Sequence, residues 1–151
     1  MIVETAEFGY VKVAKEDIIY FPEGIYGLED IKEYVFLQKN DLNVPIVWMQ
    51  AVSNKHIRFV VFDPLFIVES YEPVITDEVL TKLGAESLSS LVFYVIAVVP
   101  KDIRDMTVNL KSPIVINPQT RKAYQVILEN PAYQVRHLVV FGKYNSERCG
   151  T

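Results

Sequence analysis

Short apolar runs, broken at intervals by glycine, proline and polar residues, set the pattern of this chain. Residues 2–5 and 10–13 alternate between apolar and polar positions, with Phe8-Gly9 between them. Because successive side chains of a strand point to opposite faces, the alternation predicts an N-terminal β-hairpin. Further strands are predicted at residues 18–21, 34–38, 46–50, 58–62 and 91–99, with a polar connection at residues 39–43.

Residues 105–128 contain three strand-forming runs in close succession. The runs are residues 107–110, 114–117 and 124–128. A proline precedes the second run, and an Asn-Pro pair precedes the third. Because proline cannot donate a hydrogen bond to a β-ladder and Asn-Pro favours a turn, the stretch predicts three strands joined by a break and a turn. The second run is apolar at successive positions from Ile114 to Ile116, which predicts a strand covered on both faces. A last apolar run follows at residues 138–141.

One helix is clearly indicated, over residues 76–84. Thr76 is a good N-cap, and Gly84 can end the helix because glycine readily adopts a left-handed conformation. Two acids at the start, Asp77 and Glu78, suit the positive end of the helix dipole. Three apolar residues share one face of the helix: Val79, Leu80 and Leu83. Residues 22–34 contain two glycines and predict a structured loop with one brief helical turn at residues 28–33. A second short helical turn is predicted near residues 86–90.

About nine or ten short strands with one or two short helices predict a mainly β fold in a single domain. The expected architecture is an antiparallel barrel-like roll or a pair of crossed sheets. The domain is expected to cover residues 1–142, and residues 143–151 are expected to be a polar tail that frays. A length of 151 residues and a hydrophobic content of 50% allow a substantial core and argue against disorder.

The longest apolar run, residues 91–99, has fewer than half of the roughly 20 residues that a membrane-spanning helix needs, and its length predicts a buried strand instead. Glu4 and Glu7 stand where a secretory signal would carry basic and then apolar residues. The single cysteine, Cys149, cannot form an internal disulfide. These features predict a soluble cytoplasmic protein with no membrane partner.

The net charge of −4 is unevenly distributed along the chain. Residues 1–33 carry eight acids and three bases, and residues 66–90 carry five acids and one base. Residues 101–151 carry eight bases and four acids. Acidic segments are poorly suited to direct nucleic-acid binding and better suited to a basic protein surface. Ordinary solvated faces would produce the same distribution, so charge alone leaves both interpretations open.

The sequence contains no pattern typical of a catalytic or metal site. Its two histidines, His56 and His137, are far apart and belong to no ligand motif. Phosphate-binding loops, nucleophile elbows and dinucleotide fingerprints are absent from the sequence. Adjacent acids such as Asp77 and Glu78 do not face each other on a helix. We therefore expect no enzyme activity, no metal and no cofactor.

Several segments share their sequence with one protein family. The most specific is NLKSPIVINPQTRKAYQVIL, at residues 109–128, and the others are the opening 30 residues, FVVFDPLFIVESYE at residues 59–72 and YQVRHLVVF at residues 133–141. Together they resemble the FliW family of flagellar assembly factors across nearly the whole chain. Four positions depart from the usual family residues, each by a small or apolar replacement: Tyr26, Leu28, Val108 and Ser112.

The resemblance implies a non-catalytic regulatory protein with two protein partners. FliW proteins bind flagellin, and they bind and antagonise CsrA, a small basic RNA-binding dimer that represses translation of flagellin mRNA. Export of flagellin frees FliW to sequester CsrA, so that flagellin translation resumes.

Two groups of residues are predicted to contact partners. The long connection at residues 62–78 combines aromatic and acidic residues, and its hypothetical contacts with CsrA are Glu69, Tyr71, Glu72, Asp77 and Glu78. Within the family signature, the candidates are Asn109, Arg121 and Lys122. The competing explanations are that Asn109 satisfies backbone groups beside Pro113, that Asn117-Pro118 serves only as a turn, and that Tyr71 packs against the core. The alternative function is an RNA- or small-ligand-binding β domain that uses the basic C-terminal half, through Lys111, Arg121, Lys122, Arg136 and His137.

Overall fold

The computed structural model describes residues 1–38 and 46–140. Eleven strands occur in this part: β1 (Ile2–Thr5), β2 (Gly9–Lys12), β3 (Ile18–Tyr20), β4 (Glu33–Gln38), β5 (Val47–Ala51), β6 (Arg58–Phe62), β7 (Val92–Val98), β8 (Thr107–Val108), β9 (Ile114–Asn117), β10 (Lys122–Gln125) and β11 (His137–Leu138). The helices are α1 (Pro64–Ile67) and α2 (Asp77–Leu83), with 3₁₀ turns η1 (Lys15–Asp17), η2 (Leu88–Ser90) and η3 (Ile103–Asp105).

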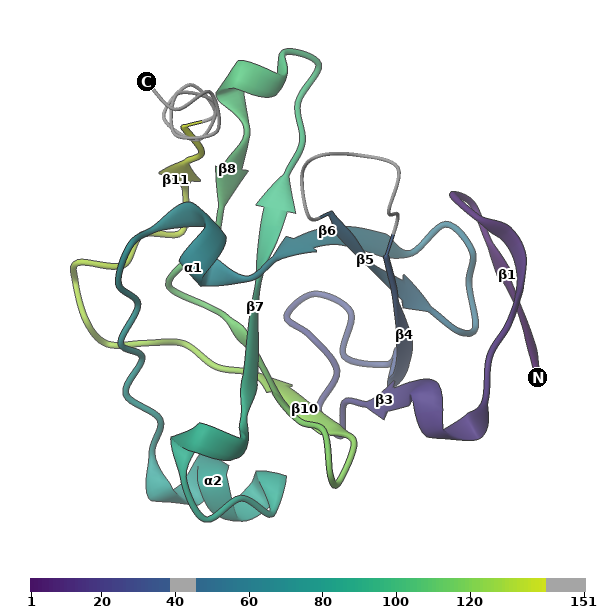
Figure 1. Cartoon of the computed structure of the whole chain (residues 1–151), viewed down its shortest axis with the longest axis horizontal. Coiled ribbons are helices and arrows are strands. Elements are labelled where there is room, and N and C mark those ends of the chain that lie inside the picture. Colours follow the sequence, from purple (N-terminus) through teal and green to yellow (C-terminus); the bar gives the residue numbers. More distant parts are fainter. Residues whose placement is uncertain (39–45, 141–151) are drawn as a thin grey trace, which may run out of the picture.

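Seven strands close into a barrel in the order β7-β6-β5-β4-β3-β10-β9, because β9 pairs back with β7. In Figure 1 these strands form a ring, and the loop between β3 and β4 is drawn across its middle. Nearly all neighbours are antiparallel; the exception is β3 with β10, which are parallel and share a single register pair, Tyr20 with Lys122. The fold is therefore mainly β and barrel-like, as the sequence predicts.

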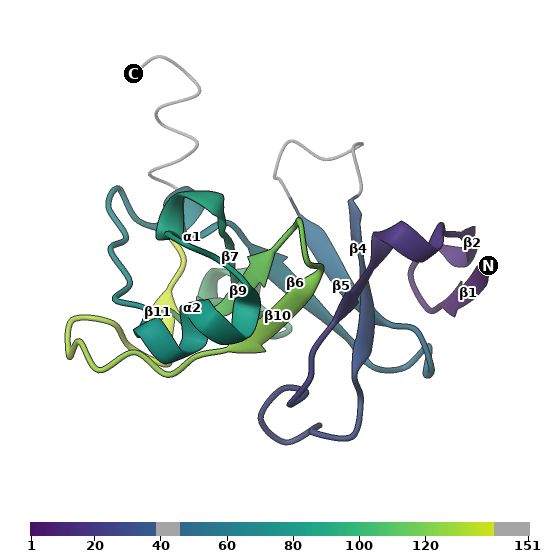
Figure 2. The same cartoon turned by 90° about the horizontal axis from the view of Figure 1, so that it is seen from below.

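Two further groups of strands lie outside the barrel. Beyond the residues that pair with β9, the end of β7 pairs with β8, and β8 pairs with β11. The hairpin of β1 and β2 forms a separate two-stranded sheet. It lies on the side of the barrel opposite α1 and α2 (Figures 1 and 2).

The barrel interior is filled by alternate residues of its strands, together with the loop that follows β3. Met49 and Ala51 of β5 are fully buried there, and Phe21 and Ile25 close the interior from the loop. On the outer face, α2 packs against β9 and β10 through a cluster that includes Leu83 and Val115. This arrangement explains the apolar run of β9: its neighbours Ile114 and Ile116 face the interior while Val115 lies beneath α2. The prediction of a strand covered on both faces is confirmed.

Several boundaries differ from the sequence-based expectation. The strand expected at residues 124–128 is instead Lys122–Gln125, because the hairpin register pairs Lys122 directly with Asn117. The strand at residues 107–110 is only two residues long, since β11 pairs with those two positions alone. The structured loop expected after β3 is confirmed, with successive turns and a bridge between Ile25 and Leu28. The brief helix expected within it, at residues 28–33, does not form.

The connection at residues 62–78 contains a helix that was not predicted, α1. The long strand expected to be buried at residues 91–99 is buried at its centre but exposed at its ends, at Val92 and Val98. The helix at residues 76–84 and the turn near residues 86–90 are confirmed as α2 and η2. The polar connection 39–43, Phe141 and the tail 143–151 lie outside the described residues.

Candidate functional site

Acidic residues are concentrated in one segment of the chain on one side of the barrel, and we call residues 63–90 the acidic segment. It comprises α1, the loop after it, α2 and η2. It carries one base, Lys82, and six exposed acids: Asp63, Glu69, Glu72, Asp77, Glu78 and Glu86. The Lys82 ammonium lies 3.5 Å from a Glu78 oxygen and 3.8 Å from a Glu23 oxygen, so the one base is already matched to acids. The segment therefore presents a net negative surface.

The Asp63-Pro64 pair, which directly follows β6, begins α1. The Asp63 carboxylate accepts a hydrogen bond of 2.9 Å from the backbone N–H of Leu65, and Pro64 occupies the first turn. Aspartate as N-cap and proline at the first helical position are both favoured at a helix start. The ring of Phe66 stacks on Phe62 with centroids 5.7 Å apart, which fixes α1 against the outer face of the barrel.

Tyr71 faces inward and holds the loop between the two helices. Its hydroxyl donates a hydrogen bond of 2.6 Å to the carbonyl of Leu110, and its ring lies 4.7 Å from that of Tyr133. The Tyr133 hydroxyl in turn accepts a hydrogen bond from the backbone N–H of Glu72 at 2.7 Å. Burial, and to a lesser degree Tyr133, raise the pKa of Tyr71 above its ordinary value. The tyrosine thus positions the exposed Glu72, and a direct partner contact by Tyr71 itself stays a prediction.

Helix α2 presents Asp77 and Glu78 to solvent from its first turn. Thr76 caps it through a hydrogen bond of 3.3 Å from the Val79 N–H, as the sequence predicts. At its other end the Leu83 carbonyl accepts two hydrogen bonds of 2.9 Å, from the Asn117 amide and from the Thr120 hydroxyl. The acidic helix is therefore fastened to the turn between β9 and β10.

The basic turn of the family signature lies next to that junction. Arg121 and Lys122 are both exposed. Arg121 has a φ of 59°, in the left-handed region, and its N–H donates to the carbonyl of Asn117 at 2.8 Å. Asn109 is different: it is half-buried, and its side-chain oxygen accepts a hydrogen bond of 2.9 Å from the Ser112 N–H. Asn109 thus satisfies a backbone N–H beside Pro113, which was its alternative role in the sequence, and a direct partner contact by Asn109 stays a prediction.

The basic residues of the alternative function are spread over two ends of β7. Arg121 and Lys122 adjoin β9, which pairs with the start of β7. His137 pairs with Val108 of β8, which pairs with the end of β7. Residues of one strand advance by about 3.3 Å each, so these bases do not form a single basic platform.

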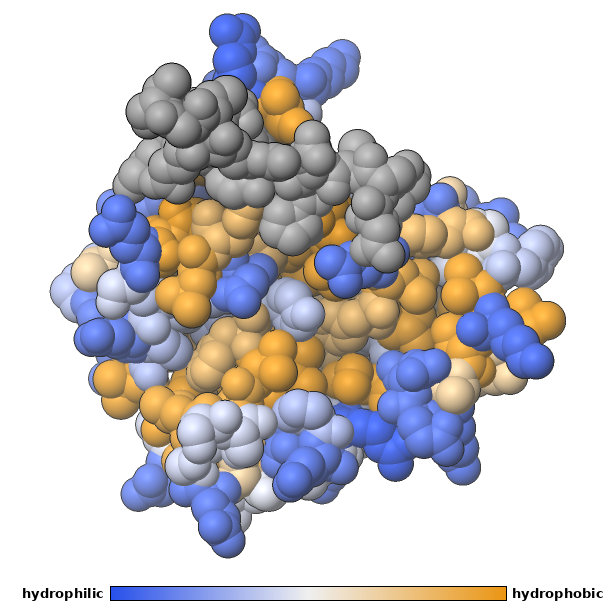
Figure 3. All heavy atoms as spheres, viewed as in Figure 1, coloured by the Kyte–Doolittle hydropathy of each residue, from blue (hydrophilic) through white to orange (hydrophobic). Residues whose placement is uncertain are grey.

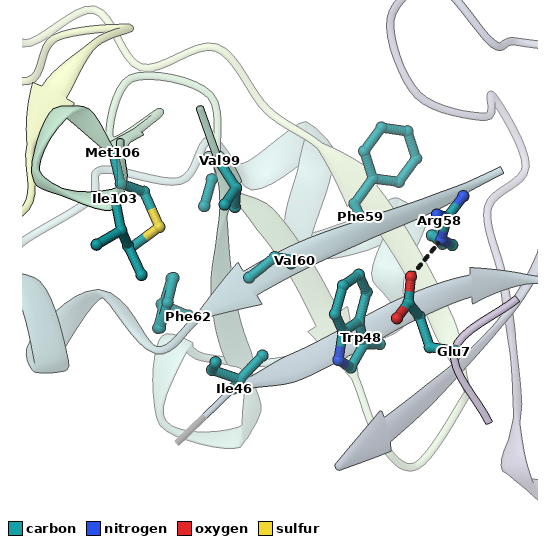
Figure 4. A pocket seen from close by; sticks show the side chains of 11 residues that line it. Glu7, Ile46, Trp48, Arg58, Phe59, Val60, Phe62, Val99, Ile103 and Met106 are labelled. Carbon is teal, nitrogen blue, oxygen red and sulfur yellow. Dashed lines mark hydrogen bonds and ion pairs between the residues drawn. The ribbon is translucent and has the colours of Figure 1, made fainter. Parts of the chain in front are cut away.

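Sequence reasoning missed an apolar groove on the outer face of β5, β6 and β7, shown in Figure 4. The groove has a volume of about 480 Å³ and includes Trp48, Val60, Phe62, Ile103 and Met106. The ion pair of Glu7 and Arg58, 2.9 Å long, borders it near Trp48. The signal was present in β6, which is apolar at four successive positions and therefore has an apolar outer face as well as an inner one. We call it the outer groove.

Within residues 1–38 and 46–140, no cluster of three or more histidine, cysteine or acidic side chains could hold a metal ion. In the same part of the chain, no helix combines the length and apolar character needed to span a membrane.

Comparison with known proteins agrees with this fold. The sequence model described as FliW protein matches residues 2–139. The chain belongs to the FliW family. A flagellar assembly factor FliW from Ruminiclostridium cellulolyticum is 40% identical over 140 residues, which cover 93% of this chain and 95% of that protein. One from Thermoanaerobacter pseudethanolicus is 39% identical, with 93% of each chain covered.

A solved structure shows the same architecture. The crystal structure of a flagellar assembly factor FliW superposes with a TM-score of 0.84 at 33% sequence identity. The alignment covers 91% of this chain and 96% of that one. The FliW resemblance found in the sequence and the barrel-like fold are thus both confirmed.

Proposed function

We propose that this protein is a flagellar assembly factor that binds flagellin and also binds and antagonises the translational regulator CsrA. In this scheme, flagellin occupies the protein until export removes it. The freed protein then sequesters CsrA, and translation of flagellin mRNA resumes. The protein acts in the cytoplasm, by binding alone, without catalysis or a cofactor.

Membership of the FliW family, whose relatives named above are flagellar assembly factors, supports the role in flagellar assembly. The acidic segment supports the choice of CsrA as a partner, and it is the observation that carries the proposal. It concentrates six acids against one base on one side of the barrel. A small basic RNA-binding protein is complementary to such a surface, and the same surface repels nucleic acid.

An RNA retention assay tests the antagonism. CsrA is bound to the labelled leader of flagellin mRNA, and the purified protein is added in increasing amounts. We expect the amount of retained RNA to fall, and added flagellin to restore it. Unchanged RNA retention in the presence of excess folded protein would exclude antagonism of CsrA.

Charge reversal tests the surface. Glu69→Lys combined with Glu72→Lys should weaken binding to CsrA at low salt and reduce the salt dependence of the affinity. The matched control reverses two exposed acids elsewhere, Glu16 and Glu129, and changes the net charge equally. If both double variants bind CsrA as the unmodified protein does, the acidic segment is not the contact surface.

A further inference from the structure

A second apolar hollow, smaller than the outer groove, opens within the acidic segment. Its volume is about 350 Å³, and nearly all of its lining is apolar. The walls come from α1, the following loop, η2 and β7, through Pro64, Leu65, Tyr71, Pro73, Leu88 and Phe93. We call it the apolar notch. In Figure 3, apolar surface is visible between the positions of α1 and α2, with hydrophilic residues around it.

Two leucines of the notch are held in solvent. Leu65 is 61% exposed and Leu88 is 42% exposed. A single exposed leucine is common and needs no explanation. Here the two leucines line one concavity together with the half-buried rings of Tyr71 and Phe93. Such an arrangement is typical of a binding site that receives an apolar side chain.

Hydrogen bonds fix the walls of the notch before any partner arrives. The Asp63 carboxylate holds the start of α1, and the Tyr71 hydroxyl is anchored on Leu110. Tyr133 holds the backbone of Glu72, and the N–H of Leu91 donates to the carbonyl of Leu88 at 3.0 Å. A preformed site loses little conformational entropy on binding, so even a small apolar contact adds to the affinity.

The charge around the notch selects its occupant. Glu72 lies on its rim, and the acidic segment that contains it carries six acids and one base, a net charge of −5. A second copy of this chain, with its own net charge of −4, is disfavoured, and so is any nucleic acid. The complementary occupant is an apolar side chain that a basic protein surface carries between lysine or arginine residues.

We propose that the apolar notch is the anchor pocket for the basic partner, and that it receives one aliphatic or aromatic side chain of CsrA. This inference rests on the proposed function, because it assigns the anchor of that same interaction. The surrounding acids then govern the rate and salt dependence of association, and the notch governs how slowly the complex dissociates.

The test measures the affinity and dissociation rate of immobilised CsrA for single variants at two salt concentrations. Leu65→Ser and Leu88→Ser should each weaken binding about tenfold, mainly through faster dissociation. This is the order of magnitude expected when a leucine side chain is no longer buried in the complex. The factor by which each leucine variant weakens binding should be the same at both salt concentrations. Glu72→Gln should instead weaken binding mostly at low salt. Ile103→Ser is the matched control, since Ile103 is 56% exposed in the outer groove.

Each outcome separates the two proposals. If the unmodified protein binds CsrA and both leucine variants bind equally well, the anchor is overturned while the proposed function stands. If Ile103→Ser alone weakens binding, the outer groove is the anchor and the notch is not. If the unmodified, folded protein does not bind CsrA, both proposals fail. Urea denaturation of each variant checks that its fold is intact. If the free protein sediments as a dimer and the leucine variants as monomers, the notch binds a second copy of this chain, and the proposed anchor is overturned.

Discussion

Tyr34 carries a hydroxyl group into the interior of the barrel, where no residue in the described part of the chain hydrogen-bonds with it. Its ring packs edge-on against Phe21 with centroids 5.0 Å apart. The ring therefore contributes to the core, while the hydroxyl costs free energy because it loses its water without a replacement.

Tyr34→Phe should raise the free energy of unfolding by about 1 kcal/mol, the order of the penalty for a buried unpaired hydroxyl. Urea denaturation at neutral pH measures this change. A loss of more than about 1 kcal/mol would show that the hydroxyl has a stabilising partner.

The same tyrosine predicts how stability depends on alkaline pH. Burial raises the pKa of Tyr34 from 10.0 to about 12. Below pH 10 both the folded and unfolded states keep the proton; between pH 10 and about 12 only the folded state keeps it, so stability falls as pH rises. Denaturation midpoints of the unmodified protein and Tyr34→Phe should therefore diverge above pH 10. Parallel curves across that range would contradict the shifted pKa.

Arg121 combines an exposed charge with a left-handed backbone, so its two roles can be separated by substitution. Asparagine tolerates a φ of 59° and removes the charge, whereas valine removes the charge and is strained there. We expect Arg121→Asn to keep the unfolding free energy within about 0.5 kcal/mol and Arg121→Val to lower it by about 1–2 kcal/mol. Equal stabilities of the two variants in urea would mean that the backbone at this turn relaxes.

At the scale of elements, the junction between α2 and the β9–β10 turn decides where the acidic helix lies. Asn117 is 1% exposed and joins the turn to the last carbonyl of α2. Gly84, just after α2, has a φ of 70°, and a Cβ there would lie 3.0 Å from the Thr120 Cγ2. Glycine is favoured at this position by its left-handed backbone conformation and by its small size beside the Thr120 methyl group.

Gly84→Ala should lower the free energy of unfolding by about 1–2 kcal/mol. Adding Thr120→Ser removes the crowding methyl and keeps the hydroxyl that bonds to Leu83, so the double variant should recover part of the loss. A double-mutant cycle in urea measures the coupling. Strict additivity of the two changes would show that the methyl contact is unimportant.

The helix and most strands could be predicted because capping residues and apolar alternation lie within the elements that they specify. Thr76 and Gly84 mark the two ends of α2, and the alternation of β1 and β2 marks their hairpin. Boundaries that depend on a distant partner were missed. The position of β10 follows from its register against β9, and the short β8 follows from its pairing with β11.

The candidate site was predictable in composition and only partly in geometry. The acids of residues 62–78 were visible in the sequence, and so was the basic turn. The inward direction of Tyr71 was only one of two alternatives in the sequence, because it depends on distant residues. Leu110 lies 39 positions from Tyr71, and Tyr133 lies 61 positions from Glu72. The apolar notch and the outer groove were also invisible, since each gathers residues from several elements.

At the scale of the whole molecule, closure of the barrel depends on its weakest junction. Strands β3 and β10 share one register pair, and the Tyr20 N–H donates to the Arg121 carbonyl at 2.8 Å. The loop after β3 reinforces this junction, because the Tyr26 N–H donates to the Gln125 side chain at 2.9 Å. The barrel, once closed, holds the acidic segment on one side and the β1–β2 hairpin on the other (Figure 2).

The most direct test of the account is titration calorimetry of this protein against purified CsrA from the same organism, at two salt concentrations. We expect saturable binding whose affinity falls as salt rises, because the acidic segment faces a basic partner. Saturable binding that does not depend on salt would contradict the role of the acidic segment. The absence of binding by the folded protein at low salt would contradict the antagonism of CsrA altogether.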